Sequence, residues 1–478
     1  MTQPIKFGTD GWRGVIADDF TFERVALVAP LAAQVLKETY GDTTENDHTV
    51  IVGYDRRFLA EEFAQKAADA IREAGFDVKL SETYAPTPAF SLAAHQQKAL
   101  GAIVITASHN PGKYLGLKVK GGFGGSVNPD VTQKIEARLD SPLPPVNIPG
   151  TLESFDPWPG YCETLQSKVK IDEIKEAIAS RQLSVFADVM HGAAAGGLQR
   201  LLGDGVHEIN GDRDPLFDGG APEPLPRYLS ELFRQIKSHS AKTDGVTVGL
   251  VFDGDSDRIA AVDGDGNFLS SQILIPILIE HLSTRRGFTG EVIKTVSGSD
   301  LIPRIVDLFG LSLHETPIGY KYIADRMLSN SVLIGGEESG GIGYGTHIPE
   351  RDALLSALYV LEAVVESGED LSRTYRRLQE QTGFTSAYDR IDLPLASMDV
   401  RAKLVAELEN NPIKEIAGQA VVDCLTVDGY KFRLADGRWL LIRFSGTEPV
   451  LRLYCEADTI QTVSKTLSWA KDWALSQN

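Results

Sequence analysis

Short runs of apolar residues recur along the chain, with longer amphipathic segments between them. Each run has the length of one buried strand, and segments such as 59–75 and 225–240 repeat apolar residues at the spacing of a helix face. Strands that alternate with helices in this way are typical of βαβ units with mostly parallel sheets. The sequence therefore predicts an α/β fold. The apolar runs are HTVIVGYD at 48–55, GAIVITAS at 101–108, QLSVFADVM at 182–190, VTVGLVFD at 246–253, EVIKTVS at 291–297 and NSVLIGGEE at 330–338.

Three breaks interrupt this pattern. The Pro-rich stretch 140–150 has little apolar periodicity and is typical of a linker. A Gly-Asp turn at 262–269 precedes a long apolar helix, and a third break follows a helix that ends near 380–385. Beyond it, strands alternate before a final helix at 458–475, as in a small α+β domain. We expect three similar α/β domains and a smaller C-terminal one, at 1–147, 148–266, 267–381 and 382–478.

Composition and charge narrow the function. The chain has 478 residues, too many for one hydrophobic core, and a formal net charge of -19. This charge argues against nucleic acid or an anionic membrane as the main partner, because both attract basic surfaces. An anionic substrate would need local Lys, Arg or metal to offset the field. Three scattered cysteines, Cys162, Cys424 and Cys455, form no CxxC pair and indicate neither a disulfide framework nor a zinc site.

The N-terminus has no apolar segment of the kind found in signal peptides, and no apolar stretch approaches the roughly 18 residues that span a bilayer. We therefore expect a cytoplasmic protein that is not exported. Apolar helix faces would serve equally well inside one chain or against a second copy, so both a monomer and a homodimer remain open.

Four polar loops share one position, directly after an apolar run. In open α/β sheets, ligands bind beyond the carboxyl ends of the strands, so four such loops are expected to line one cleft. This shared position is stronger evidence than any single loop. The loops are TASHNP at 106–111, DGDSDR at 253–258, GGEESGG at 335–341 and RFSGTEP at 443–449.

The loop DGDSDR is typical of a metal site. Its three carboxylates, Asp253, Asp255 and Asp257, can converge on one hard cation around the Gly between them. An EF-hand is excluded because the twelfth position is Gly264 rather than Glu and because a strand precedes the loop. Three carboxylates with room for a phosphoryl oxygen favour Mg²⁺. The similar turn DGDG at 263–266 lacks the adjacent Arg and is interpreted as a solvated acidic turn.

Ser108 in TASHNP has three interpretations. A hydrolase nucleophile is disfavoured because the GxSxG motif is absent and because His109, its chain neighbour, is not expected to face it. A structural turn serine and a phosphoryl carrier beside a metal both fit the residues. In the second case the metal would offset the roughly -1.5 to -2 charge of a phosphoserine.

The other two loops favour phosphate and sugar binding. A fixed cation, hydroxyls and the N-H groups of a Gly loop can hold a phosphate from several directions. Those residues are Arg443, Ser445, Gly446 and Thr447. In GGEESGG, a carboxylate and a hydroxyl are suited to neighbouring hydroxyl groups of a sugar, and these belong to Glu338 and Ser339.

Taken in order along the chain, these motifs resemble those of the α-D-phosphohexomutases, the phosphoglucomutase and phosphomannomutase group. The resemblance covers essentially the whole chain and includes FGTDGWRG at 7–14, GYDRR at 53–57 and YLGLK at 114–118 besides the four loops. It implies a heart-shaped protein with three similar α/β domains, a smaller C-terminal domain that hinges, and a central cleft.

The resemblance also implies roles for single residues. Ser108 would be the phosphoserine and, with the three Asp of DGDSDR, would hold Mg²⁺. The cationic residues Lys118, Arg258 and Arg13 would neutralise the transferring phosphoryl group, with Lys118 a candidate to handle the hydroxyl proton and His109 also in the catalytic group. Glu338 and Ser339 would bind sugar hydroxyls. The phosphate that is not being transferred would be held by Lys321, Arg443, Ser445, Gly446 and Thr447.

The activity implied is the exchange of glucose 1-phosphate and glucose 6-phosphate through a hexose 1,6-bisphosphate. Mannose phosphates remain open, because mannose differs from glucose at C2, away from the hydroxyls assigned to Glu338 and Ser339. Glucosamine phosphate is less expected, because relatives that act on amino sugars tend to carry Gln in this loop. The same residues would also serve a glucose 1,6-bisphosphate synthase that takes its phosphoryl group from fructose 1,6-bisphosphate. A silent sugar-phosphate sensor is disfavoured because every motif residue is present.

Overall fold

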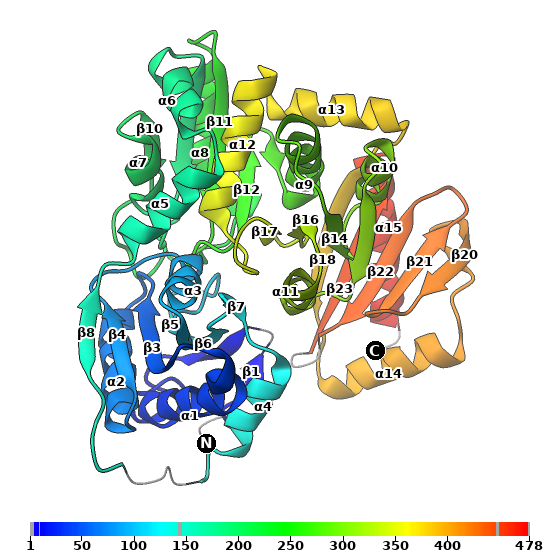
Figure 1. Ribbon diagram of the computed structural model, residues 1–478. Helices are drawn as coiled ribbons and strands as arrows, with labels where there is room; N and C mark the ends of the chain where they lie inside the picture. The colour runs from blue at the N-terminus through cyan, green and yellow to red at the C-terminus, as the bar shows by residue number, and fades with distance from the viewer. Residues whose placement is uncertain (1–3, 9, 142–145, 446–448, 477–478) are drawn as a thin grey trace.

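The computed structural model describes residues 4–8, 10–141, 146–445 and 449–476, and it contains four domains, each built on its own β-sheet (Figure 1). The expected α/β fold of four domains is confirmed. The predicted limits of the domains stay predictions. Two strands that lie just beyond those limits, β8 (Leu152–Phe155) and β13 (Phe268–Leu269), complete the sheets of the first and second domains.

The first domain has the largest sheet, ordered β1-β2-β6-β5-β3-β4-β8, with β7 paired to β6. The central strand β5 is buried over its whole length, as expected for an apolar run covered on both faces. The elements of this domain are β1 (Phe7–Gly8), β2 (Gly11–Val15), α1 (Phe22–Tyr40), η1 (Gly41–Thr43), β3 (Asn46–Tyr54), α2 (Ala60–Glu73), β4 (Asp77–Ser81), α3 (Thr87–Gln96), β5 (Ala99–Ile105), β6 (Tyr114–Gly121), β7 (Gly125–Ser126) and α4 (Pro129–Ala137).

The second and third domains have smaller sheets, ordered β10-β9-β11-β12-β13 and β15-β14-β16-β17. The second domain contains α5 (Trp158–Lys168), α6 (Ile171–Ala179), β9 (Leu183–Asp188), α7 (Gly197–Leu202), β10 (Val206–Ile209), η2 (Pro226–Tyr228), α8 (Ser230–Ser240), β11 (Val246–Phe252) and β12 (Ile259–Val262). The third contains α9 (Ser271–Glu280), the π-helix η3 (His281–Arg285), β14 (Glu291–Thr295), α10 (Leu301–Leu308), β15 (Ser312–Thr316), α11 (Tyr320–Ser329), β16 (Val332–Gly336), β17 (Ile342–Tyr344), α12 (Ala353–Ser367) and α13 (Leu371–Thr382).

These three domains repeat one strand order. The series β6-β5-β3-β4, β12-β11-β9-β10 and β17-β16-β14-β15 correspond strand by strand, so the expected similarity of the three domains is confirmed. In each, the inner strands run parallel and the strand that follows the candidate loop returns antiparallel. The sheets are therefore mixed rather than mostly parallel, because each candidate loop closes a hairpin instead of leading into a helix.

The C-terminal domain differs from the other three. Its sheet is antiparallel throughout the pairs described, in the order β18-β23-β22-β21-β20-β19. The fourth candidate loop again joins two antiparallel neighbours, β22 and β23. The elements are β18 (Ala387–Pro394), α14 (Met398–Asn410), β19 (Glu415–Ile416), β20 (Gln419–Leu425), β21 (Tyr430–Leu434), β22 (Trp439–Phe444), β23 (Val450–Ala457) and α15 (Ile460–Ser476).

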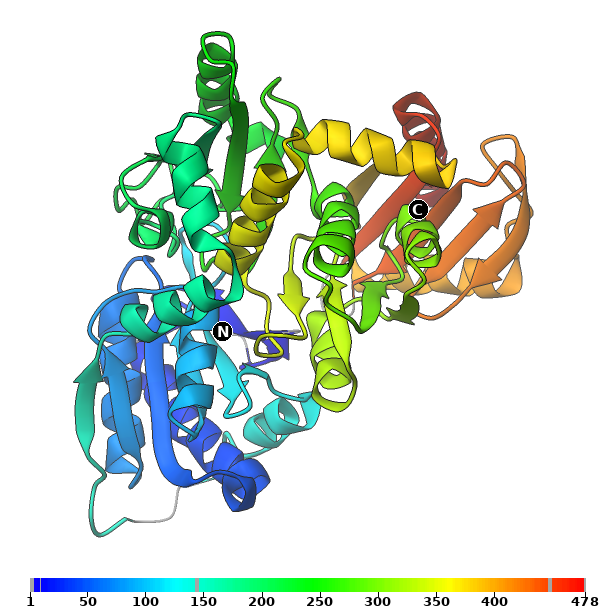
Figure 2. The ribbon, with the colours of Figure 1, turned by 45° about the horizontal axis from the view of Figure 1, so that its top comes forward.

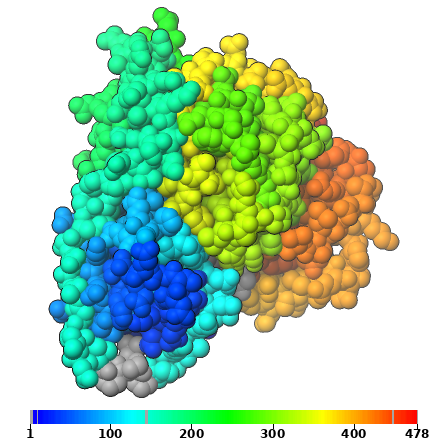
Figure 3. All heavy atoms as spheres, viewed as in Figure 1, coloured from blue at the N-terminus to red at the C-terminus, as the bar shows by residue number. Residues whose placement is uncertain are grey.

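The hydrophobic cores show how the domains are joined. One core continues through helices and strands of the first three domains, and the largely buried helix α12 passes between the second and third sheets (Figure 2). The C-terminal domain has a separate core and meets the third domain through a small cluster that includes Val296, Trp439, Leu441 and Tyr454. It borders the third domain on one side of the molecule (Figure 3). The first three domains thus form one packed unit, to which the fourth is attached by a limited interface.

Candidate active site

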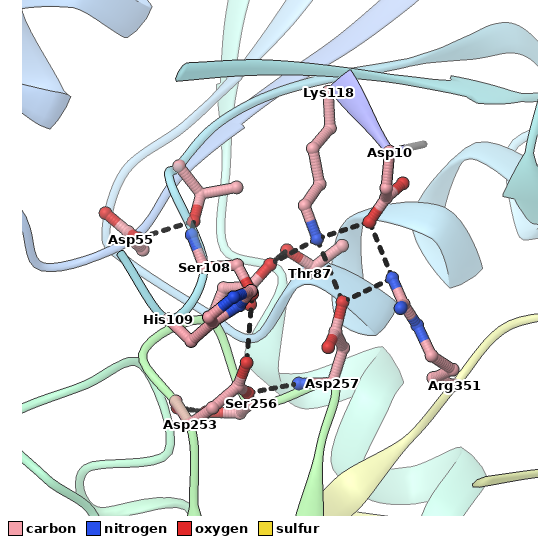
Figure 4. Close-up of polar contacts among 12 residues, drawn as sticks. Asp10, Asp55, Thr87, Ser108, His109, Lys118, Asp253, Ser256, Asp257 and Arg351 are labelled. Atoms are coloured by element: carbon pink, nitrogen blue, oxygen red, sulfur yellow. Dashed lines mark hydrogen bonds and ion pairs between the residues drawn. The ribbon is translucent and has the colours of Figure 1, made fainter. Parts of the chain in front are cut away.

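Two hairpin loops from different domains meet at Ser108 (Figure 4). The hydroxyl of Ser108 donates a hydrogen bond to Asp253 Oδ2 at 3.0 Å. Ser108 is buried, and its backbone φ of 53° lies in the left-handed region, which residues with a side chain seldom adopt. Strained backbone of this kind is concentrated at functional sites. The Ser108 hydroxyl thus faces the loop DGDSDR of the second domain, called the acidic loop below.

A buried arginine from GYDRR holds the Ser108 loop in this conformation. The side chain of Arg57 extends beneath the loop, and its Nε lies 3.3 Å from Asp55 Oδ2. Asp55 in turn accepts a hydrogen bond from Thr106 Oγ1, which accepts one from the Ser108 N-H. Five donors in a planar fork make Arg suited to several acceptors at once. The guanidinium of Arg57 donates to the carbonyl oxygens of Ser108, Asn110, Pro111 and Tyr114.

The three carboxylates of DGDSDR converge as expected. One oxygen from each of Asp253, Asp255 and Asp257 lies within 4.8 Å of the others, and all three side chains are buried. Burial, together with the carboxylates of Asp257 and Asp255, raises the pKa of Asp253 well above its ordinary value. A bound divalent cation would relieve this repulsion.

Two carboxylate oxygens of this cluster have no hydrogen bond among the described residues, as expected for a metal site. The Oδ1 atoms of Asp255 and Asp257 are buried and have no hydrogen-bond partner among the described residues. Their Oδ2 atoms, by contrast, contact Lys118, Arg351 or Thr87. Buried carboxylate oxygens without partners are costly unless a ligand satisfies them, and hard oxygen ligands suit Mg²⁺. Asp253, Asp255 and Asp257 could therefore hold a divalent cation beside the Ser108 hydroxyl.

A second layer of charge surrounds the cluster. Lys118 Nζ lies 2.7 Å from Asp10, 2.8 Å from Asp255 and 2.9 Å from Asp257. Arg351 Nη2 lies 2.6 Å from Asp10 and 2.7 Å from Asp257. Burial opposes the charge on Lys118, but the three carboxylates outweigh it and hold the pKa of this amine above its ordinary value. Lys118 is therefore a fixed positive charge in this arrangement.

Burial opposes the ionisation of Asp255 too. Lys118 and the hydroxyl of Thr87, which donates to Asp255 Oδ2 at 2.6 Å, outweigh that effect. Together they hold the pKa of Asp255 below its ordinary value. The carboxylate is thus kept ionised, which is the form that binds a metal.

Arg13 of strand β2 and Arg258 of the DGDSDR loop lie near the same centre. Arg13 Nη1 donates to Asn110 Oδ1 at 2.8 Å, next to the Ser108 loop. Arg258 Nε lies 3.8 Å from Asp257 Oδ1, and the Arg258 backbone forms a bridge with Gly341 at the end of the third loop. The DGDSDR loop and the loop expected to bind sugar are therefore joined directly through their backbones.

The position of His109 corrects one expectation. Its Nδ1 lies 3.3 Å from Ser108 Oγ, although side chains of chain neighbours were not expected to face each other. The left-handed backbone at Ser108 removes the usual alternation of side chains and brings the ring back toward the hydroxyl. Burial and the charges of Arg258 and Arg13 lower the pKa of His109 well below its ordinary value, so the ring is neutral at pH 7.

The third loop contributes Glu338 and meets the C-terminal domain. Glu338 Oε1 accepts a hydrogen bond from Arg390 Nη1 of β18 at 3.0 Å. Ser339 follows it in the loop and is partly exposed. Lys321 at the start of α11 places its Nζ 5.0 Å from the ring centre of Tyr322. Within the described chain, Lys321 has no hydrogen bond or ion pair with the other candidate residues.

The fourth loop is described in part. Arg443 is the last residue but one of β22 and donates from Nε to Asp428 Oδ2 at 3.0 Å, and the same oxygen accepts from the Ile318 N-H of the third domain. Ser445 is buried. Gly446 and Thr447 lie outside the described residues. Arg443 is thus fixed at the junction of the third and fourth domains.

Several residues with central contacts had no role in the sequence analysis. Asp10 and Arg57 lie inside motifs quoted there, FGTDGWRG and GYDRR, so the motifs were the available signal. Thr87 and Arg351 belong to no such motif and come from α3 and from the segment before α12. Their contribution follows from tertiary packing, which places them against Asp255 and Asp257.

Four family models match the chain in order. They describe the phosphoglucomutase/phosphomannomutase alpha/beta/alpha domains I, II and III and the C-terminal domain, and they match residues 4–143, 159–266, 270–382 and 400–467. None of the helices described in the structure is long and apolar enough to cross a membrane.

Individual proteins are similar over nearly the whole length. A phosphoglucosamine mutase of Limosilactobacillus reuteri is 28% identical, with 98% of each chain covered. A phosphoglucomutase/phosphomannomutase of Thermococcus kodakarensis is 28% identical, with 94% of each chain covered. A crystal structure assigned as a phosphomannomutase from Thermus thermophilus is 32% identical and has a TM-score of 0.85, with 99% of this chain and 100% of that chain covered.

Proposed function

Because the chain belongs to the phosphoglucomutase/phosphomannomutase family, we propose that it interconverts glucose 1-phosphate and glucose 6-phosphate, with mannose phosphates as further substrates. Enzymes of this family are phosphotransferase-type mutases. The observation that carries the proposal is the Ser108 hydroxyl, 3.0 Å from Asp253, in a cluster where the Oδ1 atoms of Asp255 and Asp257 have no hydrogen bond among the described residues. This geometry supports a phosphoryl carrier next to a cation site.

In the proposed reaction, the phosphoryl group on Ser108 Oγ passes to the free hydroxyl of a hexose phosphate. The bond from phosphorus to Ser108 Oγ breaks as a bond to the sugar oxygen forms, and the hydroxyl proton leaves to a base, for which the neutral ring of His109 is a candidate. Lys118, the other residue expected to handle this proton, is held protonated by its three carboxylate partners and serves as a fixed charge instead. The hexose 1,6-bisphosphate then turns over, and its other phosphoryl group returns to Ser108. Positioning and fixed charge supply most of the catalysis in such transfers.

The chain's own cations match this demand. Lys118, Arg13 and Arg258 surround Ser108 and would offset charge on the group in transfer. Mg²⁺ held by Asp253, Asp255 and Asp257 would supply further charge neutralisation there. Glu338 and Ser339 would accept from and donate to sugar hydroxyls. Arg443 and Ser445, together with Lys321, Gly446 and Thr447, would hold the second phosphate.

Glucosamine phosphate is a second candidate substrate, and a specific observation favours it. The relative from Limosilactobacillus reuteri, similar over 98% of this chain, is a phosphoglucosamine mutase. The loop sequence GGEESGG favours the neutral hexoses, because it has Glu where Gln was expected for amino sugars. The proposal therefore predicts a higher kcat/KM for glucose 1-phosphate than for glucosamine 1-phosphate.

A ³¹P NMR time course tests the proposal. Purified protein with Mg²⁺ and a trace of glucose 1,6-bisphosphate is given glucose, mannose or glucosamine 1-phosphate in separate samples, and fructose 1,6-bisphosphate is added midway. We expect prompt glucose 6-phosphate before the addition. Glucose 1,6-bisphosphate that accumulates only after the addition would instead identify a bisphosphate synthase.

A matched variant assigns the carrier. Ser108→Ala should leave the fold and the three carboxylates of the cation site in place but abolish turnover and phosphoryl incorporation, because the acceptor oxygen is missing. Full activity in this variant would refute the role of Ser108.

A further inference from the structure

Glu338 has one partner that the proposed mechanism does not use. Within the described part of the chain, its carboxylate accepts a single hydrogen bond, from Arg390 of the C-terminal domain at 3.0 Å. The backbone of the same loop is fixed separately, because Ser271 Oγ donates to the Glu338 carbonyl oxygen at 2.7 Å. The third domain thus positions the loop, whereas the fourth domain orients the carboxylate.

Arg390 connects three domains. Besides Glu338, its guanidinium lies 3.6 Å from Glu223 of the second domain and 3.7 Å from Asp392 on its own strand. The Arg390 and Glu338 side chains are 26% and 9% exposed, so this pair is screened less by water than a surface pair. The carboxylate of Glu338 is the main cause that holds the pKa of Arg390 above its ordinary value. This favourable contact exists only while the C-terminal domain lies against the other domains.

The sheet of the C-terminal domain places Arg390 on the same face as the phosphate-binding arginine. Asp392 pairs with Arg452, and Arg452 pairs with Arg443, so these three side chains share one face of the sheet. Arg390 lies two residues from Asp392 and therefore points to that face as well. One sheet thus carries both Arg443, which is proposed to bind phosphate, and Arg390, the partner of Glu338.

We propose that Arg390 is a positioning residue: by holding Glu338 Oε1, it leaves Oε2 aimed at the sugar hydroxyls, and it does so only while the C-terminal domain is closed. The inference rests on the proposed function. When the domain moves away, Arg390 and Arg443 move with it. Glu338 then loses its orientation at the same time as Arg443 leaves the phosphate. Binding of the hydroxyls is thereby coupled to binding of the phosphate.

Steady-state kinetics of the full-length enzyme test this coupling. Arg390→Met removes the charge but keeps a similar length, and Asp392→Asn is the matched control, because Asp392 contacts Arg390 but not Glu338. We expect Arg390→Met to raise the KM for glucose 1-phosphate about tenfold and to change kcat by less than about threefold. Asp392→Asn should resemble the wild type, and Arg390→Lys should recover part of the loss. An unchanged KM in Arg390→Met would overturn the proposal.

A double-mutant cycle separates positioning from a purely structural role. If Arg390 acts through Glu338, adding Arg390→Met to Glu338→Gln should raise KM little further. If the factors by which the two substitutions raise KM simply multiply in the double variant, the proposal is contradicted and Arg390 acts in domain packing alone. Should the wild type turn over no hexose phosphate, the proposed function fails. The affinity of the wild type and of Arg390→Met for glucose 6-phosphate, measured by calorimetry, would then test the role of Arg390 separately. Equal affinities would refute it.

Discussion

Three buried carboxylates at one point are unfavourable unless something balances them. Asp253, Asp255 and Asp257 are each almost fully buried, yet two of their oxygens lack any hydrogen bond among the described residues. Lys118 and Arg351 contact the Oδ2 atoms of Asp255 and Asp257, whereas the Oδ1 atoms have no hydrogen bond among the described residues. This asymmetry favours a cation at the Oδ1 atoms.

Asp255→Asn should weaken Mg²⁺ binding, because it removes one negative ligand while keeping the size of the side chain. We expect the Mg²⁺ concentration for half-maximal activity to rise by about a hundredfold. Asp265→Asn is the matched control, since it makes the same charge change at an exposed residue of the second acidic turn. This turn was expected to be solvated, but its Asp263 is buried and accepts hydrogen bonds from Asn267 and Ser372. Titration of activity with Mg²⁺ in both variants gives the comparison. An equal Mg²⁺ requirement in the two variants would contradict the metal site.

At the residue scale, the sequence predicted the residues that lie in recognisable loops. Ser108 and the three Asp could be found because a polar loop follows an apolar strand in each case. Arg351 could not be found, because its contacts with Asp10 and Asp257 join the first, second and third domains and leave no local pattern. The contact between Ser108 and His109 depends on one backbone angle, which composition does not determine.

At the element scale, each candidate loop closes a hairpin. The strand that follows a loop pairs antiparallel with the strand before it, as in β5 and β6 or β11 and β12. Both ends of every loop are therefore fixed to one sheet, which restricts the position of the loop more than a connection to a helix would. Apolar runs predicted the first strand of each hairpin. The alternating strands expected in the C-terminal segment included the return strand β23, whereas the return strands of the first three hairpins were not predicted. The return strands β12 and β17 are short and have too few residues to show a period.

The close approach of two hairpins requires Gly254. A Cβ at this position would lie 2.3 Å from the Ser108 carbonyl oxygen and 2.8 Å from Pro222 Cγ. Gly254→Ala should therefore push the DGDSDR loop away from Ser108 and lower kcat by about a hundredfold, because small misplacements of reacting groups are costly.

Gly264→Ala is the control for this prediction. Its Cβ would lie no closer than 3.3 Å to any neighbour, the nearest atom being Ser240 Oγ, so we expect kcat within about threefold of wild type. Thermal unfolding of both variants would show whether Gly254→Ala has lost stability as well as rate. A normal kcat in Gly254→Ala would show that the rate does not depend on the close approach of the Ser108 loop and the DGDSDR loop.

At the scale of the whole molecule, the interface between the third and fourth domains contains a buried lysine. Lys431 donates to the Val296 carbonyl oxygen at 2.9 Å and lies 4.2 Å from the ring centre of Trp439. Burial, and then the nearby charge of Lys294, lower the pKa of Lys431 to about 8. The amine is therefore charged less readily in the folded protein than in the unfolded chain.

The sign of the pH effect follows from this difference. Between about pH 8 and the unfolded value near 10.4, the unfolded chain binds more protons at Lys431, so stability rises with pH in that window. Relative to Lys431→Met, the wild type should gain up to about 3 kcal/mol in free energy of unfolding across it. Urea denaturation of both proteins at pH 8 and pH 10 measures the gain. A difference that does not change with pH would show that Lys431 ionises normally.

The architecture of the whole molecule was predictable in outline. Alternation of strands and helices indicated three α/β domains and a different fourth, and the shared strand order confirms their similarity. The helix α12 lies in the predicted third domain but packs against α6 and β11 of the second. That packing joins the cores of neighbouring domains, and no feature of a single amphipathic helix predicts which neighbour it will contact.

The division of charge at the active site also bears on how the protein assembles during synthesis. Of the cations around the Ser108 loop, Arg13, Arg57 and Lys118 belong to the first domain, whereas Arg258 belongs to the second, together with Asp253, Asp255 and Asp257. A nascent chain completes most of the first domain before the acidic loop has been translated. We expect opposite charges on the two surfaces to attract each other then and to favour docking of the second domain onto the first. The charged residues proposed for catalysis would thus have an earlier role as well, because their attraction would help the two domains to dock in the correct position.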